Sequence, residues 1–295
     1  MTILHAVGGP GPAPAQAPSP AAARWFPGTD LPSRAPLRLI CFPYAGGTPS
    51  AFRRWPAALG PGAQVIGVLY PGRGTRLGEE PRRELGPLVA EIADALIECG
   101  LARDYLTFGH SMGALVAYEV SCELRRRGQP GPLHAFVSAS RAPQLYGGET
   151  SHALPDDELW RLIRGLGGVP GGDTLPDSYL TRRLPVLRAD LSACERYRWQ
   201  PRPPLDCPMT AFCATDDPIA GAGQVAAWRA CTSRSFVQHT VPGDHFFVTT
   251  APQPLLRQLG DELRPLRSRH PFTPAADPST TTIPDPRRTP SWLSA

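Results

Sequence analysis

The stretch Phe108-Gly109-His110-Ser111-Met112-Gly113-Ala114 is the most informative part of this 295-residue sequence. Its Gly-x-Ser-x-Gly pattern follows a strand-like run at residues 105–108 and precedes a strongly helical run at residues 114–127. A serine on a tight strand-to-helix turn presents its hydroxyl above the edge of a sheet, and flanking glycines allow the backbones to approach closely. The helix start also directs N–H groups and the positive end of its dipole at developing negative charge. In this context the pattern predicts that Ser111 is a nucleophile.

The bulk composition excludes several classes of function. The net charge of +4 is modest and the charged residues are scattered along the chain, so the sequence does not indicate a nucleic-acid-binding surface. The chain contains arginine but no lysine, which excludes Schiff-base lysine chemistry and a Walker-type phosphate lysine. Its 7 cysteines are dispersed, which argues against a disulfide framework or a zinc site and favours a reducing compartment. Without a secretory leader pattern or an apolar run long enough to span a bilayer, the sequence predicts a soluble cytoplasmic protein.

Strand and helix patterns alternate along the central part of the chain. The strand-like runs are residues 37–42, 64–69, 105–108, 134–138, 209–214 and 236–241, and the helical runs are residues 85–97, 114–127, 224–230 and 254–266. The alternation predicts the α/β class, with a mostly parallel central sheet and helices on both faces. We expect one domain at residues 35–267, flanked by a disordered Ala/Pro-rich arm at residues 1–34 and a disordered tail at residues 268–295.

One segment interrupts this alternation. Residues 151–200 contain no convincing strand, but helical patterns occur at residues 159–166 and 184–197. The segment is several times longer than the usual connection between two elements. We therefore expect a helical lid over the functional site. An ordinary crossover with an extra pair of helices is the alternative.

A serine hydroxyl is a poor nucleophile at neutral pH, so Ser111 needs a base, and the base needs an orienting acid. In open α/β hydrolases these residues follow in the order Ser, Asp, His, each just after a strand. His245 lies in a loop after the last strand-like run, and this position favours a general base. The other downstream histidines lie in strand patterns, in the insertion or in the tail (His134, His152, His239 and His270).

Two neighbouring aspartates compete for the role of the acid. Asp216 and Asp217 both follow the strand-like run at residues 209–214. We prefer Asp217 because it directly precedes Pro218, whose fixed φ stiffens the turn. Asp216 remains the alternative, since spacing alone does not separate adjacent residues.

An oxyanion hole would complete the site. It should use the N–H of the residue after the nucleophile, Met112, and a second N–H from the loop after an early strand. Residues 42–47 form that loop, and the pair Gly46-Gly47 allows its backbone to turn inward. A plain turn at the end of a strand is the alternative interpretation.

With these residues identified, the chain from about residue 37 to residue 266 resembles a type II thioesterase, the stand-alone editing hydrolase of polyketide and nonribosomal peptide synthesis. The resemblance rests on six motifs in the same order: Phe42-Pro43-Tyr44-Ala45-Gly46-Gly47, Tyr70-Pro71-Gly72-Arg73-Gly74, Gly109-His110-Ser111-Met112-Gly113-Ala114, Leu187-Arg188-Ala189-Asp190-Leu191, Asp217-Pro218 and Pro242-Gly243-Asp244-His245-Phe246-Phe247.

This resemblance implies an α/β-hydrolase fold and a role for each site residue. Ser111 would be the nucleophile, His245 the base and Asp217 the orienting acid. The backbone N–H groups of Ala45 and Met112 would form the oxyanion hole. The sequence departs from the family pattern at residues 213–215, where a glycine is common before the acidic turn. This departure leaves the choice between Asp216 and Asp217 open.

The resemblance also implies a substrate and a partner. The helical insertion would be a mobile lid. Substrates would be thioesters on the phosphopantetheine arm of acyl or peptidyl carrier protein domains, so the enzyme would need no cofactor or metal of its own. We expect a monomer that binds neither nucleic acid nor membrane. Arg73 and Arg188 match family motifs without an obvious chemical role, and we expect them to pair with acids such as Asp190 or to contact the carrier.

Two rival interpretations remain at this stage. A releasing or cyclising thioesterase, or a general carboxylesterase, would use the same three catalytic residues. A non-catalytic α/β-hydrolase serving as a scaffold would need no complete set, whereas all three residue types are present here in order.

Overall fold

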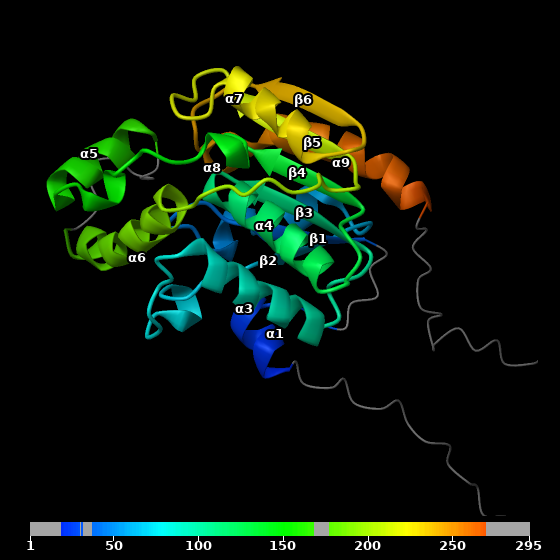
Figure 1. Ribbon diagram of the computed structural model, residues 1–295, viewed down its shortest axis with the longest axis horizontal. Helices are drawn as coiled ribbons and strands as arrows, with labels where there is room; N and C mark the ends of the chain where they lie inside the picture. Colours follow the sequence, from blue (N-terminus) through cyan, green and yellow to red (C-terminus); the bar gives the residue numbers. More distant parts are fainter. Residues whose placement is uncertain (1–18, 30, 32–36, 168–176, 270–295) are drawn as a thin grey trace, which may run out of the picture.

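The computed structural model describes residues 19–29, 31, 37–167 and 177–269 (Figure 1). Six strands form one sheet in the order β2-β1-β3-β4-β5-β6, and all five neighbouring pairs are parallel. The strands are β1 Arg38–Phe42, β2 Gln64–Gly67, β3 Tyr105–His110, β4 His134–Ser138, β5 Met209–Ala214 and β6 Phe236–Val241. The predicted parallel α/β sheet is confirmed, and β2 ends two residues earlier than its apolar run suggested.

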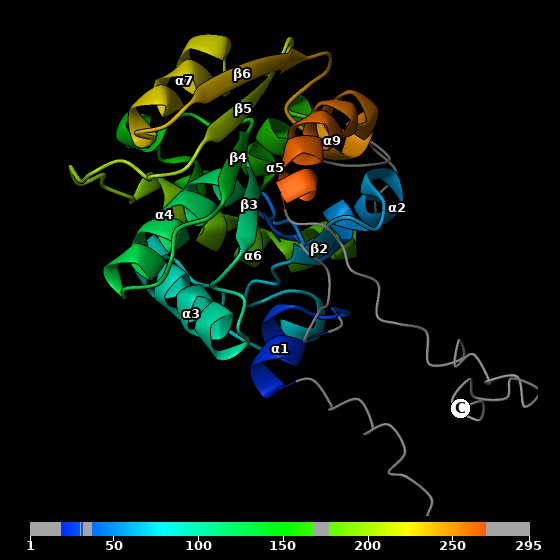
Figure 2. The same ribbon diagram turned by 90° about the vertical axis from the view of Figure 1, so that its right-hand side faces the viewer.

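Helices cover both faces of this sheet (Figure 2). Helices α3 (Leu85–Glu98), α4 (Met112–Arg126) and α7 (Ala222–Ala226) lie on one face, and α2 (Trp55–Leu59) and α9 (Pro252–Arg269) lie on the other. Strand side chains alternate between these faces because successive residues of a strand point in opposite directions. In β1, Ile40 packs with α3 and α4, whereas Leu39 packs with α2 and α9. Both positions are fully buried, as in a sheet covered on two sides.

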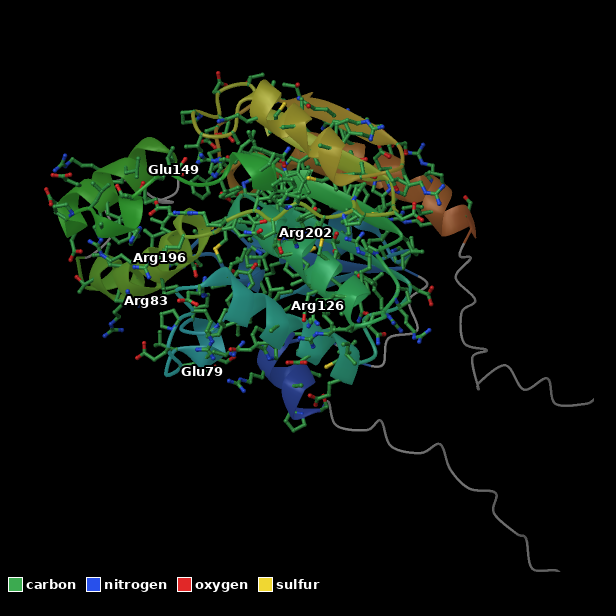
Figure 3. All side chains as sticks on the ribbon, in the orientation of Figure 1. Glu79, Arg83, Arg126, Glu149, Arg196 and Arg202 are labelled. Atoms are coloured by element: carbon green, nitrogen blue, oxygen red, sulfur yellow. The ribbon has the colours of Figure 1, made fainter. Side chains whose placement is uncertain are left out.

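The prediction of a disordered arm at residues 1–34 is wrong for its described part. Pro20–Trp25 form helix α1, which begins with Ser19 accepting a hydrogen bond from the N–H of Ala22. Trp25 is buried, and the guanidinium of Arg76 lies 3.8 Å from the centre of its ring. Glu79, labelled in Figure 3, accepts hydrogen bonds from both Arg76 and Arg24, and so joins α1 to the loop after β2. The remainder of the arm and the tail from residue 270 lie outside the described residues.

The predicted insertion at residues 151–200 is mostly helical in its described part. A short 3-10 helix (Ser151–Ala153) leads into α5 (Asp156–Gly165) and, further along, α6 (Asp177–Glu195). Leu159 of α5 packs with Leu184 and Leu187 of α6, and the two helices lie together beyond one end of the sheet (Figure 1). The predicted helices of the insertion are therefore present, whereas movement of a lid stays a prediction.

Candidate active site

Three loops at one edge of the sheet bring the predicted triad together. Ser111 directly follows β3, Asp217 lies three residues after β5, and His245 lies four residues after β6. Because all six strands are parallel, their carboxyl ends share one edge of the sheet. The Nε2 atom of His245 lies 3.0 Å from the Oγ atom of Ser111, and its Nδ1 atom lies 2.8 Å from the Oδ2 atom of Asp217. These two contacts form a continuous chain of hydrogen bonds from Asp217 through His245 to Ser111, the arrangement that activates a serine.

Backbone strain and two glycines position Ser111. Its φ of 56° and ψ of −122° place it in a region that a non-glycine residue rarely adopts. Its N–H donates to the carbonyl oxygen of Ser138 at 2.8 Å, which ties this turn to the end of β4. A Cβ atom on Gly109 would lie 2.2 Å from the carbonyl oxygen of Gly113, and one on Gly113 would lie 2.0 Å from that of Phe42. Both glycines of the pattern are therefore required by close backbone approach.

The geometry separates the two candidate aspartates. Asp217 is buried, its Oδ2 atom faces His245, and its Oδ1 atom accepts hydrogen bonds from the N–H groups of Ile219 and Ala220. Burial raises the pKa of Asp217, but these hydrogen bonds and the attraction of His245 outweigh it and hold the pKa below its ordinary value. Asp216 is exposed, and its Oδ2 atom accepts a hydrogen bond from the hydroxyl of Thr215. Asp217 is thus the residue placed to orient the imidazole.

His110 contacts the site in a way that the sequence analysis missed. It is fully buried, and its Nε2 atom lies 2.8 Å from the carbonyl oxygen of His245. Burial and the neighbouring His245 lower the pKa of His110 to about 3, so the ring is neutral. The neutral ring donates from Nε2 to the carbonyl, so its Nδ1 atom accepts from the hydroxyl of Ser138 at 3.0 Å. The position of His110 in the Gly-x-Ser-x-Gly pattern indicated that it lies near the site. Its contact with His245 could not be predicted, because it involves a backbone carbonyl oxygen, which every residue carries.

Ala45 and Met112 both border a cavity beside Ser111. They line a cavity of about 180 Å³ together with Ser111 and His245. Ala45 lies in a four-residue turn closed by a hydrogen bond from the N–H of Gly47 to the carbonyl oxygen of Tyr44 at 2.8 Å. Because a trans peptide directs its C=O and its N–H in opposite directions, the N–H of Ala45 points away from this turn. The predicted turn is therefore present, and the oxyanion hole formed by the N–H groups of Ala45 and Met112 stays a prediction.

A second, larger cavity also reaches the triad. It has a volume of about 360 Å³ and is bordered by Ser111 and His245 on one side and by the helical insertion on the other. Its side chains from the insertion are mostly apolar: Trp160, Ile163, Leu166, Arg183, Leu187 and Leu191. Such a chamber suits an apolar acyl chain. The helices of the insertion therefore form one wall of the space beside Ser111.

The two motif arginines have different partners. Arg73 forms a buried bidentate pair with Asp190, at 2.6 and 2.7 Å. Arg188 instead pairs with Asp156, at the start of α5, and donates to the carbonyl oxygen of His152. Of the two, Arg73 alone pairs with Asp190, the acid that the sequence analysis named.

Within the described part of the chain, no three His, Cys, Asp or Glu side chains lie close enough to hold a metal ion. In the same residues, no helix combines the length and apolarity that crossing a bilayer requires.

Comparisons with known proteins identify the family of this chain. RedJ, a thioesterase from the prodiginine biosynthetic pathway of Streptomyces coelicolor, is 55% identical, with a TM-score of 0.76 over 86% of this chain and 96% of its own. BorB, a type II thioesterase from the borrelidin biosynthetic cluster, is 32% identical, with a TM-score of 0.67 over 77% of this chain and 91% of its own. The gramicidin S biosynthesis protein GrsT of Aneurinibacillus migulanus is 34% identical over 82% of this chain and 94% of its own. Residues 37–263 match the thioesterase domain model, and the chain belongs to the thioesterase domain family.

Proposed function

We propose that this chain is a type II thioesterase that hydrolyses acyl thioesters on the phosphopantetheine arms of acyl or peptidyl carrier protein domains. In this role it would edit a polyketide or nonribosomal peptide assembly line. The observation that carries the proposal is the continuous chain of hydrogen bonds from Asp217 through His245 to Ser111, located where two cavities meet. The names of the similar proteins support the proposal: RedJ is a thioesterase of the prodiginine biosynthetic pathway, BorB a type II thioesterase of the borrelidin biosynthetic cluster, and GrsT a gramicidin S biosynthesis protein.

Acylation of the serine is the first step of the proposed mechanism. His245 accepts the hydroxyl proton of Ser111 at Nε2 while the serine oxygen attacks the thioester carbonyl. The carbonyl oxygen becomes an oxyanion, which the N–H groups of Ala45 and Met112 stabilise. The C–S bond then breaks, and the imidazolium of His245 protonates the leaving thiolate. Asp217 holds the ring in the required tautomer and stabilises its charged form throughout.

Hydrolysis of the acyl-serine completes the cycle. A water molecule gives a proton to Nε2 of His245 and attacks the ester carbonyl, which forms a second oxyanion in the same hole. The bond to the serine oxygen breaks, His245 returns its proton to Ser111, and a free carboxylic acid leaves. The phosphopantetheine belongs to the substrate. We also propose a monomeric enzyme in the cytoplasm, and the dispersed thiols support that location.

A panel of acyl-loaded carrier proteins tests the proposal. The carriers and the acyl chains are varied, and the released acid is measured by mass spectrometry. We expect hydrolysis by the native protein, labelling of Ser111 by a fluorophosphonate, and a loss of activity of two or more orders of magnitude in Ser111→Ala. Faster cleavage of matched oxygen esters would favour a carboxylesterase, and cyclic products would favour a cyclising enzyme. Native rates in Ser111→Ala would remove this serine from the mechanism.

A further inference from the structure

A buried carboxylate of the helical insertion contacts the loop that carries Ala45. Asp190 lies on α6, is 1% exposed, and its Oδ2 atom accepts a hydrogen bond of 2.7 Å from the N–H of Gly46. The two residues are 144 positions apart in the sequence. Gly46 directly follows the proposed oxyanion-hole residue, so this contact joins the insertion to the catalytic loop.

The contact determines the shape of the turn at residues 44–47. Gly46 has a φ of +73° at the third position of this turn, which is the signature of a type II turn. Types I and II differ mainly by a flip of the central peptide, here the one between Ala45 and Gly46. The carboxylate of Asp190 binds the N–H of this peptide and so favours one of its two orientations. The N–H of Ala45 belongs to the preceding peptide, which keeps its orientation in both turn types. The contact therefore acts on this N–H by holding the loop that carries it in one position.

Arg73 fixes the carboxylate in place. Its Nη1 and Nη2 atoms bind Oδ2 and Oδ1 of Asp190 at 2.6 and 2.7 Å, and this two-pronged contact prevents rotation of the carboxylate. Arg73 is itself held by the carbonyl oxygens of Pro71 and Gly47, at 3.2 and 3.4 Å. The arrangement therefore links the end of the turn, the loop after β2 and α6.

Stability alone does not account for this pair. Burying two charges costs solvation, and replacing a buried ion pair with apolar side chains of similar volume is often neutral or stabilising. The third contact, to Gly46, is the part that an apolar pair would lose. We propose that Asp190 is a positioning residue, which, held by Arg73, orients the loop so that the Ala45 N–H faces the developing oxyanion. This inference rests on the proposed serine thioesterase mechanism.

Two double variants separate the hydrogen bond from the ion pair. Arg73→Gln with Asp190→Asn removes both charges but keeps an oxygen that can accept from Gly46. Arg73→Met with Asp190→Leu removes both charges and the acceptor. Double replacement avoids leaving one buried charge without its partner. If the apolar pair does not fold, Arg73→Gln with Asp190→Ser replaces it, because the serine side chain is too short to reach the same N–H.

The direct measurement is the pKa of an oxyanion bound in the hole. A ¹³C-labelled alkyl trifluoromethyl ketone forms a tetrahedral adduct with the active serine, and the chemical shift of its labelled carbon reports ionisation of the adduct oxygen. We expect this pKa to rise by at least one unit in the acceptor-free variant, with kcat lowered about tenfold or more and KM little changed. The Gln/Asn pair should stay near the native values. Thermal unfolding curves verify that each variant is folded.

The outcomes distinguish this inference from the proposed function. Equal oxyanion pKa values and equal kcat values in both double variants would overturn the positioning role, while the native adduct would still support the serine mechanism. Absence of any adduct on Ser111 in the native protein would overturn the proposed function, and the positioning role with it. If kcat falls to the same degree in both double variants, the loss is caused by the missing charges. This result would also contradict the role of the hydrogen bond to Gly46.

Discussion

At the residue scale, hydrogen bonds fix both the side chain and the backbone of His245. Its ring is oriented by the Oδ2 atom of Asp217, and its backbone carbonyl accepts a hydrogen bond from the buried, neutral ring of His110. A misplaced base loses far more rate than the energy of one hydrogen bond suggests, because proton transfer needs close alignment. The two contacts therefore explain how a histidine on a loop keeps one position.

The adjacent aspartates provide a matched test of this geometry. We expect Asp217→Asn to lower kcat by roughly three to four orders of magnitude, because an amide favours the wrong tautomer of His245. Asp216→Asn should stay within about twofold of the native rate, since its carboxylate is exposed and contacts the hydroxyl of Thr215 rather than the base. Both rates are measured with one acyl-carrier substrate. A large loss in Asp216→Asn with a native rate in Asp217→Asn would reverse the assignment.

The glycines of the serine turn make a second prediction at this scale. Gly113→Ala should destabilise the fold by about 3 kcal/mol or more, because the added Cβ meets the backbone oxygen of Phe42, which cannot move aside as a side chain could. Gly260→Ala is the control. It lies within α9 with open space around its Cα, and alanine there should stabilise the protein by about 0.5–1 kcal/mol. Urea denaturation measures both changes, and similar values for the two variants would contradict the prediction.

At the element scale, the sequence predicted the strands better than the contacts between distant loops. The runs at residues 134–138 and 209–214 match β4 and β5, because strands buried on both faces are mostly apolar. The run at residues 236–241 matches β6, an edge strand that is only partly buried and that mixes apolar with polar residues. Their order in the chain also placed Ser111 and His245, since parallel strands end at the same edge. The contact between Asp190 and Gly46 could not be predicted in this way. It depends on where α6 packs, and periodicity describes a helix without its neighbours.

Helix α5 offers a prediction about acyl selectivity. Trp160 lines the cavity of about 360 Å³ beside Ser111. Trp160→Ala should enlarge this chamber and raise kcat/KM for longer or bulkier acyl chains relative to acetyl by about tenfold. Arg161→Ala is the matched control, because the exposed Arg161 pairs with Asp157 within α5 and does not line the cavity. A panel of acyl chains on one carrier gives the ratios. If this ratio of kcat/KM values is unchanged in Trp160→Ala, Trp160 does not determine which acyl chains the enzyme accepts.

At the scale of the whole molecule, amino-acid composition wrongly predicted disorder in a segment that packs against the rest of the fold. The Ala/Pro-rich beginning of the chain is typical of disorder. Its described part nevertheless forms α1, because Trp25 and Phe26 find space beside α3 and the loop after β2. Two apolar aromatic residues gave a weak signal in a segment of that composition, and their burial depends on surfaces that other elements create. Local sequence thus predicted the layers of the fold, but not which flanking residues would join them.

Buried histidines also connect local packing with the stability of the whole molecule. His134 stacks on Phe136, and its Nε2 atom lies 2.9 Å from Oγ1 of Thr210. Burial lowers the pKa of His134 to about 4, and burial lowers that of His110 to about 3. In the unfolded chain both pKa values return to about 6.5. Between these values the unfolded chain binds protons that the folded chain does not, so stability falls as the pH decreases.

This linkage predicts a stability loss on mild acidification. Between pH 7 and pH 5 each of the two histidines should lower the free energy of unfolding by about 2 kcal/mol, at about 1.4 kcal/mol per pH unit below 6.5. Carboxylates of the unfolded chain titrate below this window and contribute little. His134→Gln, which lies away from the triad and keeps a partner for Thr210, should remove about half of the loss. Urea denaturation at pH 7, 6 and 5 measures it, and parallel pH dependences of the native protein and this variant would exclude His134 as a source.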